Sequence, residues 1–114
     1  MSDEKKIVII LRQAPHGTLF PVEGLRMAVA LCGDFEPLIL VINDAVYAFI
    51  EDVDKTMYQT HINFIKGIDL DIIVDKKSLT ERGLSEDNLI EAVNTKEHKD
   101  ILQILSDCDV AIPF

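Results

Sequence analysis

Ile7-Val-Ile-Ile-Leu-Arg-Gln-Ala-Pro-His-Gly-Thr18 is the stretch that decides the fold. Its first five residues are all apolar, which is typical of a strand buried on both faces of a parallel sheet. A polar loop follows and leads into a helical pattern, and in open α/β proteins such strand-end loops bind ligands and partners. The loop holds a single glycine, Gly17, and neither a GxGxxG nor a GxxxxGK motif. It therefore does not match the usual nucleotide-binding loops.

Apolar strands and helical patterns alternate along the rest of the chain. Continuous apolar runs predict strands at 6–11, 37–42, 70–74 and 109–113. Helical segments are expected at 19–31, 43–49, 55–66 and 78–82, after Ser85, and at 95–105, whereas 89–94 fit either a helix end or a short strand. This alternation predicts one α/β domain over residues 1–114, a three-layer α/β/α fold with a mainly parallel sheet of about five strands.

Capping residues give the expected helix boundaries. Thr18 and Thr95 should cap the first and the last helix, and Asn43-Asp44 the short helix after the second strand. Ser78-Leu-Thr-Glu81 matches a capping box, and Gly83 would end the helix that it begins.

Composition limits the classes of function. The formal net charge of −9 argues against binding to phosphate backbones, which requires clustered Lys and Arg. Residues 1–6 are too polar and acidic for a signal peptide, and no apolar run approaches the ~20 residues of a membrane span. We expect a cytoplasmic protein that makes no direct contact with nucleic acid or membrane.

Two cysteines are candidate nucleophiles, and both are better explained as structural residues. They form no CxxC pair and have no histidine at metal-ligand spacing, so neither zinc nor a disulfide is expected. Cys32 falls on the apolar stripe of the first helix, at the carboxyl end, where the helix dipole disfavours a thiolate. Cys108 should lie nearer the surface, but Asp107 and Asp109 flank it and also disfavour a thiolate.

The three histidines suggest no catalytic triad. His61 falls on a helix near Met57 and Phe64 and should pack at the edge of the core. His98, in the first turn of a charged helix, should be solvated. His16 lies in the first loop, where contact with a partner or loop packing is the better interpretation.

Arg12, Asp44 and Asp75 each follow a predicted strand, so they should share the carboxyl edge of the sheet. A phosphoacceptor or metal site built there would need DxD or DD pairs, which are missing. Helix capping explains Asn43-Asp44 adequately. The residues alone thus indicate no active site, no cofactor and no metal.

Four segments nevertheless resemble the DsrE/DsrF sulfur-relay family, and specifically its DsrF/TusC-type subunits. They occur in the family's order and with similar spacing over nearly the whole chain. The segments are Arg12-Gln-Ala-Pro-His-Gly-Thr18 with Glu23 and Leu25, Asn43-Asp44-Ala-Val-Tyr47, Ile73-Val-Asp-Lys-Lys-Ser-Leu-Thr-Glu-Arg-Gly-Leu84, and Cys108-Asp-Val-Ala-Ile-Pro-Phe114.

The resemblance implies a cytoplasmic complex that passes persulfide sulfur to a carrier protein, for tRNA 2-thiolation or for dissimilatory sulfur oxidation. The implied partners are DsrE/TusD-like and DsrH/TusB-like subunits and the carrier. In DsrE/TusD-type subunits the sulfur-accepting cysteine follows the third strand, and counting back from Gly83 the matching position here is Asp75. A carboxylate cannot hold a persulfide, because sulfur transfer needs a thiolate.

The resemblance therefore favours a non-catalytic subunit without a cofactor. Its expected interface or cleft residues are Arg12, Pro15, His16, Asp44, Tyr47 and Asp75. The alternatives are a stand-alone sulfurtransferase that uses Cys108 or Cys32, and a small-ligand module that uses the strand-end cleft. Whether the oligomer is homomeric or heteromeric stays open.

Overall fold

Strand β1 (Ile7–Leu11) lies inside a five-stranded sheet, between β2 (Leu38–Val41) and β5 (Val110–Pro113). The computed structural model describes residues 5–114, so most of the stretch used to argue against a signal peptide lies outside the described residues. The strand order is β4-β3-β2-β1-β5, with β3 at Ile72–Asp75 and β4 at Asn94–Lys96. Every neighbouring pair is parallel, which confirms the predicted α/β class.

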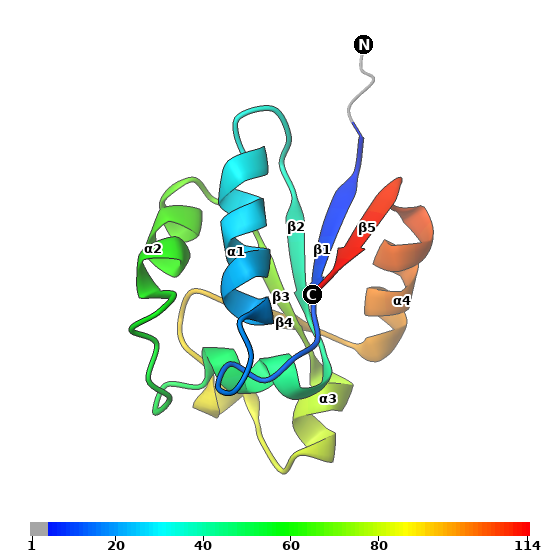
Figure 1. Ribbon diagram of the computed structural model, residues 1–114. Coiled ribbons are helices and arrows are strands. Elements are labelled where there is room, and N and C mark those ends of the chain that lie inside the picture. The colour runs from blue at the N-terminus through cyan, green and yellow to red at the C-terminus, as the bar shows by residue number, and fades with distance from the viewer. Residues whose placement is uncertain (1–4) are drawn as a thin grey trace.

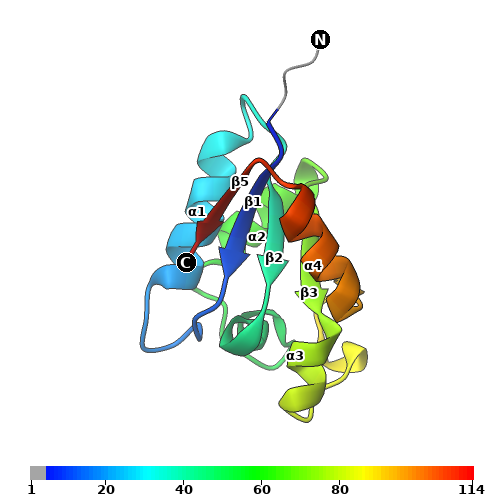
Figure 2. The same cartoon turned by 90° about the vertical axis from the view of Figure 1, so that its right-hand side faces the viewer.

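Helices cover both faces of the sheet, as the three-layer prediction requires. Helices α1 (Phe20–Leu31) and α2 (Gln59–Gly67) lie on one face, and α4 (His98–Asp107) lies on the other (Figures 1 and 2). The short helices η1 (Asn43–Phe49), α3 (Lys76–Glu81) and η2 (Glu86–Asn88) gather at the end of the sheet where the strands exit. Within residues 5–114, none of the helices combines the length and the apolar character needed to cross a membrane.

The alternation of side chains along β1 divides the core in two. Ile9 and Leu11 belong to the larger cluster, beneath α1 and α2, whereas Val8 packs beneath α4 against Leu40 and Ile101. Strands buried on both faces need such continuous apolar sequence. Helix α1 approaches β1 so closely at Gly24 that a Cβ there would collide with the side chain of Leu11.

The predicted threonine caps are wrong, because both hydroxyl groups are used elsewhere. Thr18 donates to the Ala14 carbonyl (2.8 Å) and closes the first loop, so α1 begins after Leu19. Thr95 lies in β4 and donates to the Glu86 carboxylate, and α4 begins only at His98.

Two further helix starts differ from the prediction. Helix α2 begins at Gln59, later than expected, because Lys55 folds back and donates to the carbonyls of Ile50, Glu51 and Val53. Helix α3 begins at Lys76, earlier than the predicted capping box, because Asp75 caps it by accepting from the backbone N–H of Lys77.

The cap at Ser85 is confirmed, and the undecided segment 89–94 is resolved. Ser85 forms a capping box with Asn88 at the start of η2. Leu89 makes an isolated antiparallel bridge with Ile50, and β4 begins at Asn94. The segment is therefore mostly a connection that leads into the edge strand.

Candidate functional site at the carboxyl edge of the sheet

The ends of β1, β2 and β3 bring three of the predicted site residues to one edge of the sheet, drawn at the bottom of Figure 1. Arg12 directly follows β1, and Asp44 lies in η1 after β2. Asp75 is the last residue of β3. Arg12 and Asp44 are exposed, whereas Asp75 is only 2% exposed. Only the first two can therefore form a contact surface directly.

The carboxylate of Asp75 is the centre of a hydrogen-bond network. Its Oδ1 accepts from the backbone N–H of Lys77 (3.2 Å), and its Oδ2 accepts from the Ser78 hydroxyl (2.9 Å). The Nδ1 atom of His98 lies 3.0 Å from the same Oδ2. The buried Asp75 side chain thus joins the end of β3 to helix α3 and to the first turn of α4. The hydrogen bonds from Lys77, Ser78 and His98 offset the cost of burying its carboxylate.

Ser78 connects this network to the end of β2. Its Oγ atom accepts a hydrogen bond from the backbone N–H of Asn43 (2.9 Å). Asn43 has a positive φ of 52°, a left-handed conformation that asparagine adopts more readily than most residues. The backbone turns at Asn43 in the conformation that lets its N–H reach Ser78.

Arg82 links α3 to η1 at the surface of the molecule. Its guanidinium contacts Oδ1 of Asp44 through Nε and Nη2, each at 3.0 Å, and donates from Nη1 to the Ser78 carbonyl (3.1 Å). Helix α3 is therefore tied to η1 twice, by Ser78 in the interior and by Arg82 at the surface.

The expectation that His98 would be solvated is wrong. Its side chain is 39% exposed, but its Nδ1 atom is directed at the buried carboxylate. A carboxylate can only accept, so Nδ1 is the donor in this contact. In a catalytic triad an acid orients the histidine in this way, and the histidine in turn bonds to the nucleophile. Here the Ser78 hydroxyl donates to Asp75 and not to His98. Within residues 5–114, no hydroxyl or thiol group hydrogen-bonds to this histidine.

In the stretch 5–114, no group of three or more His, Cys, Asp or Glu side chains is arranged to hold a metal ion. The observed geometry suits a fixed scaffold for the loops at this edge.

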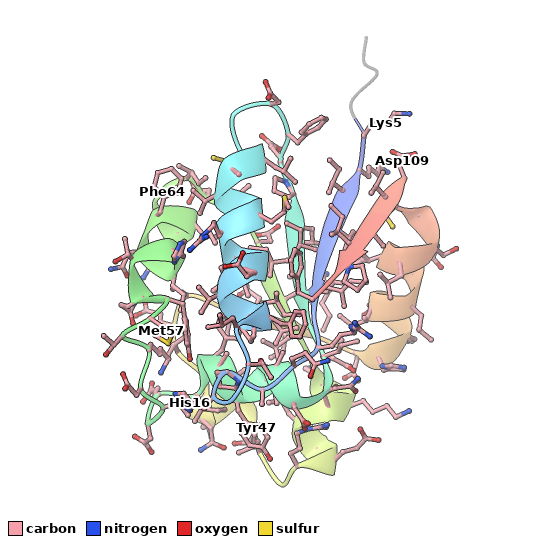
Figure 3. All side chains as sticks on the ribbon, viewed as in Figure 1. Lys5, His16, Tyr47, Met57, Phe64 and Asp109 are labelled. Carbon is pink, nitrogen blue, oxygen red and sulfur yellow. The ribbon has the colours of Figure 1, made fainter. Side chains whose placement is uncertain are left out.

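The first loop and η1 present the remaining predicted residues. Pro15 is buried beneath the loop, while His16 and Tyr47 are exposed. Figure 3 shows Tyr47 at the edge where the strands exit, near the loop that carries His16. Hydrogen bonds from Thr56 lower the pKa of Asp54, and the nearby His16 acts in the same direction. The loop therefore lies close to the segment that precedes α2.

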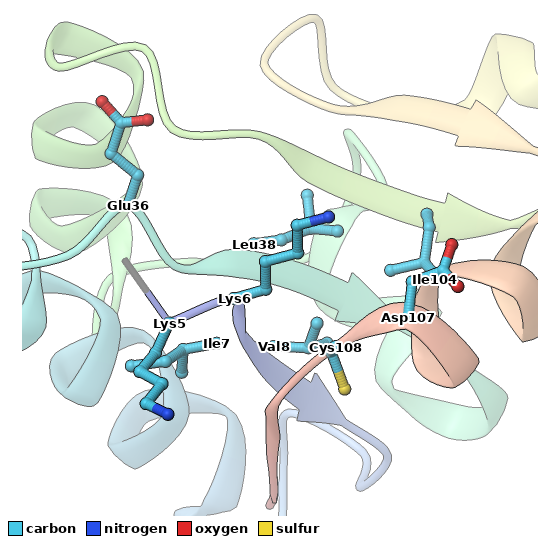
Figure 4. Close-up of a pocket in the computed structure, with 9 residues that line it drawn as sticks. All are labelled: Lys5, Lys6, Ile7, Val8, Glu36, Leu38, Ile104, Asp107 and Cys108. Atoms are coloured by element: carbon cyan, nitrogen blue, oxygen red, sulfur yellow. The ribbon is translucent and has the colours of Figure 1, made fainter. Parts of the chain in front are cut away.

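The two cysteines lie away from this network. Cys108 lines a cavity of about 410 Å³ at the opposite end of the sheet, beside Lys6, Val8 and Leu38 (Figure 4). Its thiol donates to the Leu105 carbonyl (3.2 Å), and that of Cys32 donates to the Val29 carbonyl (2.9 Å). Each thiol thus bonds to a carbonyl in the last turn of the helix that precedes it. Cys32 is half-buried at the end of α1 and not fully in the core.

Sequence reasoning missed Ser78, Arg82 and His98 as parts of the site. A signal for two of them was present, since Asp75, Ser78 and Arg82 are spaced by three and four residues and share one side of a helical turn. No local signal marks His98, because 23 residues separate it from Asp75. The parallel pairing of β3 with β4 brings the two together.

Comparisons with known proteins agree with this architecture. Residues 5–114 match the model of the DsrE/DsrF-like family. The chain is 28% identical to a TusC homolog of Aliivibrio fischeri, over 96% of this chain and 98% of that protein. It is 30% identical to the intracellular sulfur oxidation protein DsrF of Allochromatium vinosum, over 76% and 69% of the two chains.

Two solved structures share the fold. The YchN protein of E. coli superposes with a TM-score of 0.83 at 23% identity, over 96% of this chain and 99% of that chain. A protein of unknown function from Methanobacterium thermoautotrophicum superposes with a TM-score of 0.72 at 15% identity, over 98% and 100%. With a family model that matches nearly its whole length, this chain belongs to the DsrE/DsrF-like family.

Proposed function

We propose that this protein is a non-catalytic subunit of a cytoplasmic sulfur-relay complex, in the manner of TusC and DsrF. The relatives of those names, matched over most of the chain, support the sulfur-relay role. Asp75 is the observation that carries the non-catalytic part. It stands at the end of β3, where the family resemblance implies a cysteine in the sulfur-accepting subunits, and its carboxylate is fully engaged with Lys77, Ser78 and His98.

The network at Asp75 supports a role in assembly. It links η1, α3 and the start of α4 through the buried side chains of Asp75 and Ser78. The exposed residues beside it, Arg12, His16, Asp44 and Tyr47, would then be held in a defined arrangement for a neighbouring subunit. Interfaces form with less loss of entropy when their residues are ordered beforehand. The partners that we propose are DsrE/TusD-like and DsrH/TusB-like subunits.

Co-expression with those two subunits from the same genome tests this function. We expect native mass spectrometry to detect a stable complex that contains all three chains. Transfer of ³⁵S from a cysteine desulfurase should label a cysteine of the DsrE/TusD-like subunit and leave this chain unlabelled. A chain that binds neither subunit would contradict the proposal.

A stand-alone sulfurtransferase is the second candidate, favoured by one observation. Cys108 lines the cavity of about 410 Å³, which also presents Lys5 and Lys6. Incubation of the isolated chain with a desulfurase and ³⁵S-cysteine tests it. Label that is lost in Cys108→Ser but kept in Cys32→Ser would establish Cys108 as a sulfur acceptor, and absence of label would reject this function.

A further inference from the structure

An apolar groove lies where the first loop meets the segment before α2. Its volume is about 340 Å³, and it is lined by His16, Leu19, Met57 and their neighbours in the loop. Leu19 is 60% exposed, Met57 is 59% exposed and the adjacent Phe20 is 50% exposed. His16 and Met57 lie on the same side of the molecule in Figure 3, and Phe64 extends that side along α2. Large apolar side chains that are exposed together mark interaction sites.

Three carboxylates lie in the turn just before Met57, which lines this groove, and we call this turn, residues 51–54, the acidic border. Glu51, Asp52 and Asp54 are exposed in the turn that leads to Met57. Among residues 5–114, no Lys, Arg or His nitrogen lies within salt-bridge distance of any of the three. The ammonium of Lys55, in the midst of them, is buried and donates to backbone carbonyls. The border of the groove is therefore acidic and available to a cationic partner.

We propose that this groove and its acidic border, residues 51–54, dock a protein surface that presents an apolar side chain flanked by Lys or Arg. The apolar side chain would fill the space between Leu19 and Met57, and the cations would face the three carboxylates. A second copy of this chain fits poorly, because the symmetric contact would bring the same carboxylates together. The inference rests on the proposed function, since it states the chemistry by which a neighbouring subunit of the relay complex would recognise this chain.

Two variants test the surface within the assembled complex. Met57→Glu places a charge in the groove, and the double variant Glu51→Lys/Asp52→Lys reverses the border without touching Asp54, which Thr56 holds. Each should weaken binding of this chain to the co-expressed subunits at least about tenfold. Raising the salt from about 0.05 to about 0.5 M should weaken the wild type more than the double variant.

Matched controls on the other layer separate this effect from general damage. Leu102→Glu introduces the same charge at a residue of α4 that is 54% exposed, and Asp100→Lys/Asp107→Lys repeats the charge reversal on that helix. These controls should bind like the wild type. Met57→Leu should also retain binding, because it keeps the apolar volume.

The outcomes distinguish this inference from the proposed function. A wild-type complex that Met57→Glu and the double variant leave unchanged would overturn the docking surface and leave the function standing. Failure of the wild type to bind any of the subunits would overturn both. Self-association of this chain that Met57→Glu abolishes would assign the groove to a second copy and so reject the proposed partner.

Discussion

The two ends of the sheet differ in how their polar groups are held. At the carboxyl end, the side chains of Ser78 and His98 both hydrogen-bond to Asp75, and these bonds link β3, α3 and α4. At the amino end, the cavity of about 410 Å³ beside Cys108 is lined by exposed lysines, and Asp109 accepts the backbone N–H of Lys6 (2.7 Å). The carboxyl end is thus the more extensively hydrogen-bonded of the two, and it has the character of a scaffold.

The largest expected effect comes from removing the centre of the network. Asp75→Ala leaves the Ser78 hydroxyl and His98 Nδ1 without their acceptor in a buried site, and we expect a loss of about 3 kcal/mol in the free energy of unfolding. Urea denaturation measures it. Asp109→Ala, the control at the amino end, should cost about 1 kcal/mol or less because Asp109 is exposed. Equal losses in the two variants would remove the contrast between the ends.

High pH should lower the free energy of unfolding through the ionisation of Tyr58. This phenol donates to the Ala48 carbonyl in η1 (2.8 Å), and burial raises its pKa to about 12. Between pH 10 and 12 the unfolded chain loses the phenolic proton while the folded chain keeps it, so stability falls as the pH rises through this window, by on the order of 2 kcal/mol.

Tyr58→Phe is the matched variant for this pH dependence. It should be less stable at neutral pH by about 1 kcal/mol, through loss of the hydrogen bond. It should also lose less stability than the wild type between pH 10 and 12. A wild-type chain whose unfolding free energy falls no faster than that of the variant would show that Tyr58 is not protected by the fold.

A smaller effect is expected at the exposed border of the network. Arg82→Ala removes the contacts with Asp44 and with the Ser78 carbonyl, and should cost up to about 1 kcal/mol because the Asp44 side chain is largely in water. High salt should reduce the difference from the wild type. If Arg82→Ala cost as much as Asp75→Ala, the surface ion pair and not the buried carboxylate would hold α3 to η1.

The smallest effect belongs to the amino end. In Cys108→Ser the hydroxyl can donate to the Leu105 carbonyl as the thiol does, and we expect stability within about 0.5 kcal/mol of the wild type. Assembly with the neighbouring subunits should be unchanged. Loss of sulfur transfer by the assembled complex in this variant would move the functional site from the carboxyl end to the cavity at Cys108.

Strands β1, β2 and β3 were predictable because their apolar runs are typical of strands buried on both faces, whereas β4, Asn94-Thr-Lys96, has no such run and was not predicted. The first residues of the helices were harder to predict than the strands. Local rules assign Thr18 and Thr95 to helix caps, whereas in the structure their hydroxyl groups bond to Ala14 and Glu86. The strand ends located Asp44 and Asp75 at one edge. His98 could not be placed, since its partner is set by the pairing of β3 with β4 and not by neighbouring residues.

The edge strand β5 limits how this sheet can pair with a strand of another molecule. Val110 and Phe114 direct their N–H groups inward, to the carbonyls of Lys6 and Ile10, so Ala111 and Pro113 between them direct their backbone outward. Proline has no N–H, and the outer edge of β5 therefore offers only the amide of Ala111 to an incoming strand. Runaway edge-to-edge pairing, the route to fibrous aggregates, is blocked at this side of the sheet by one residue.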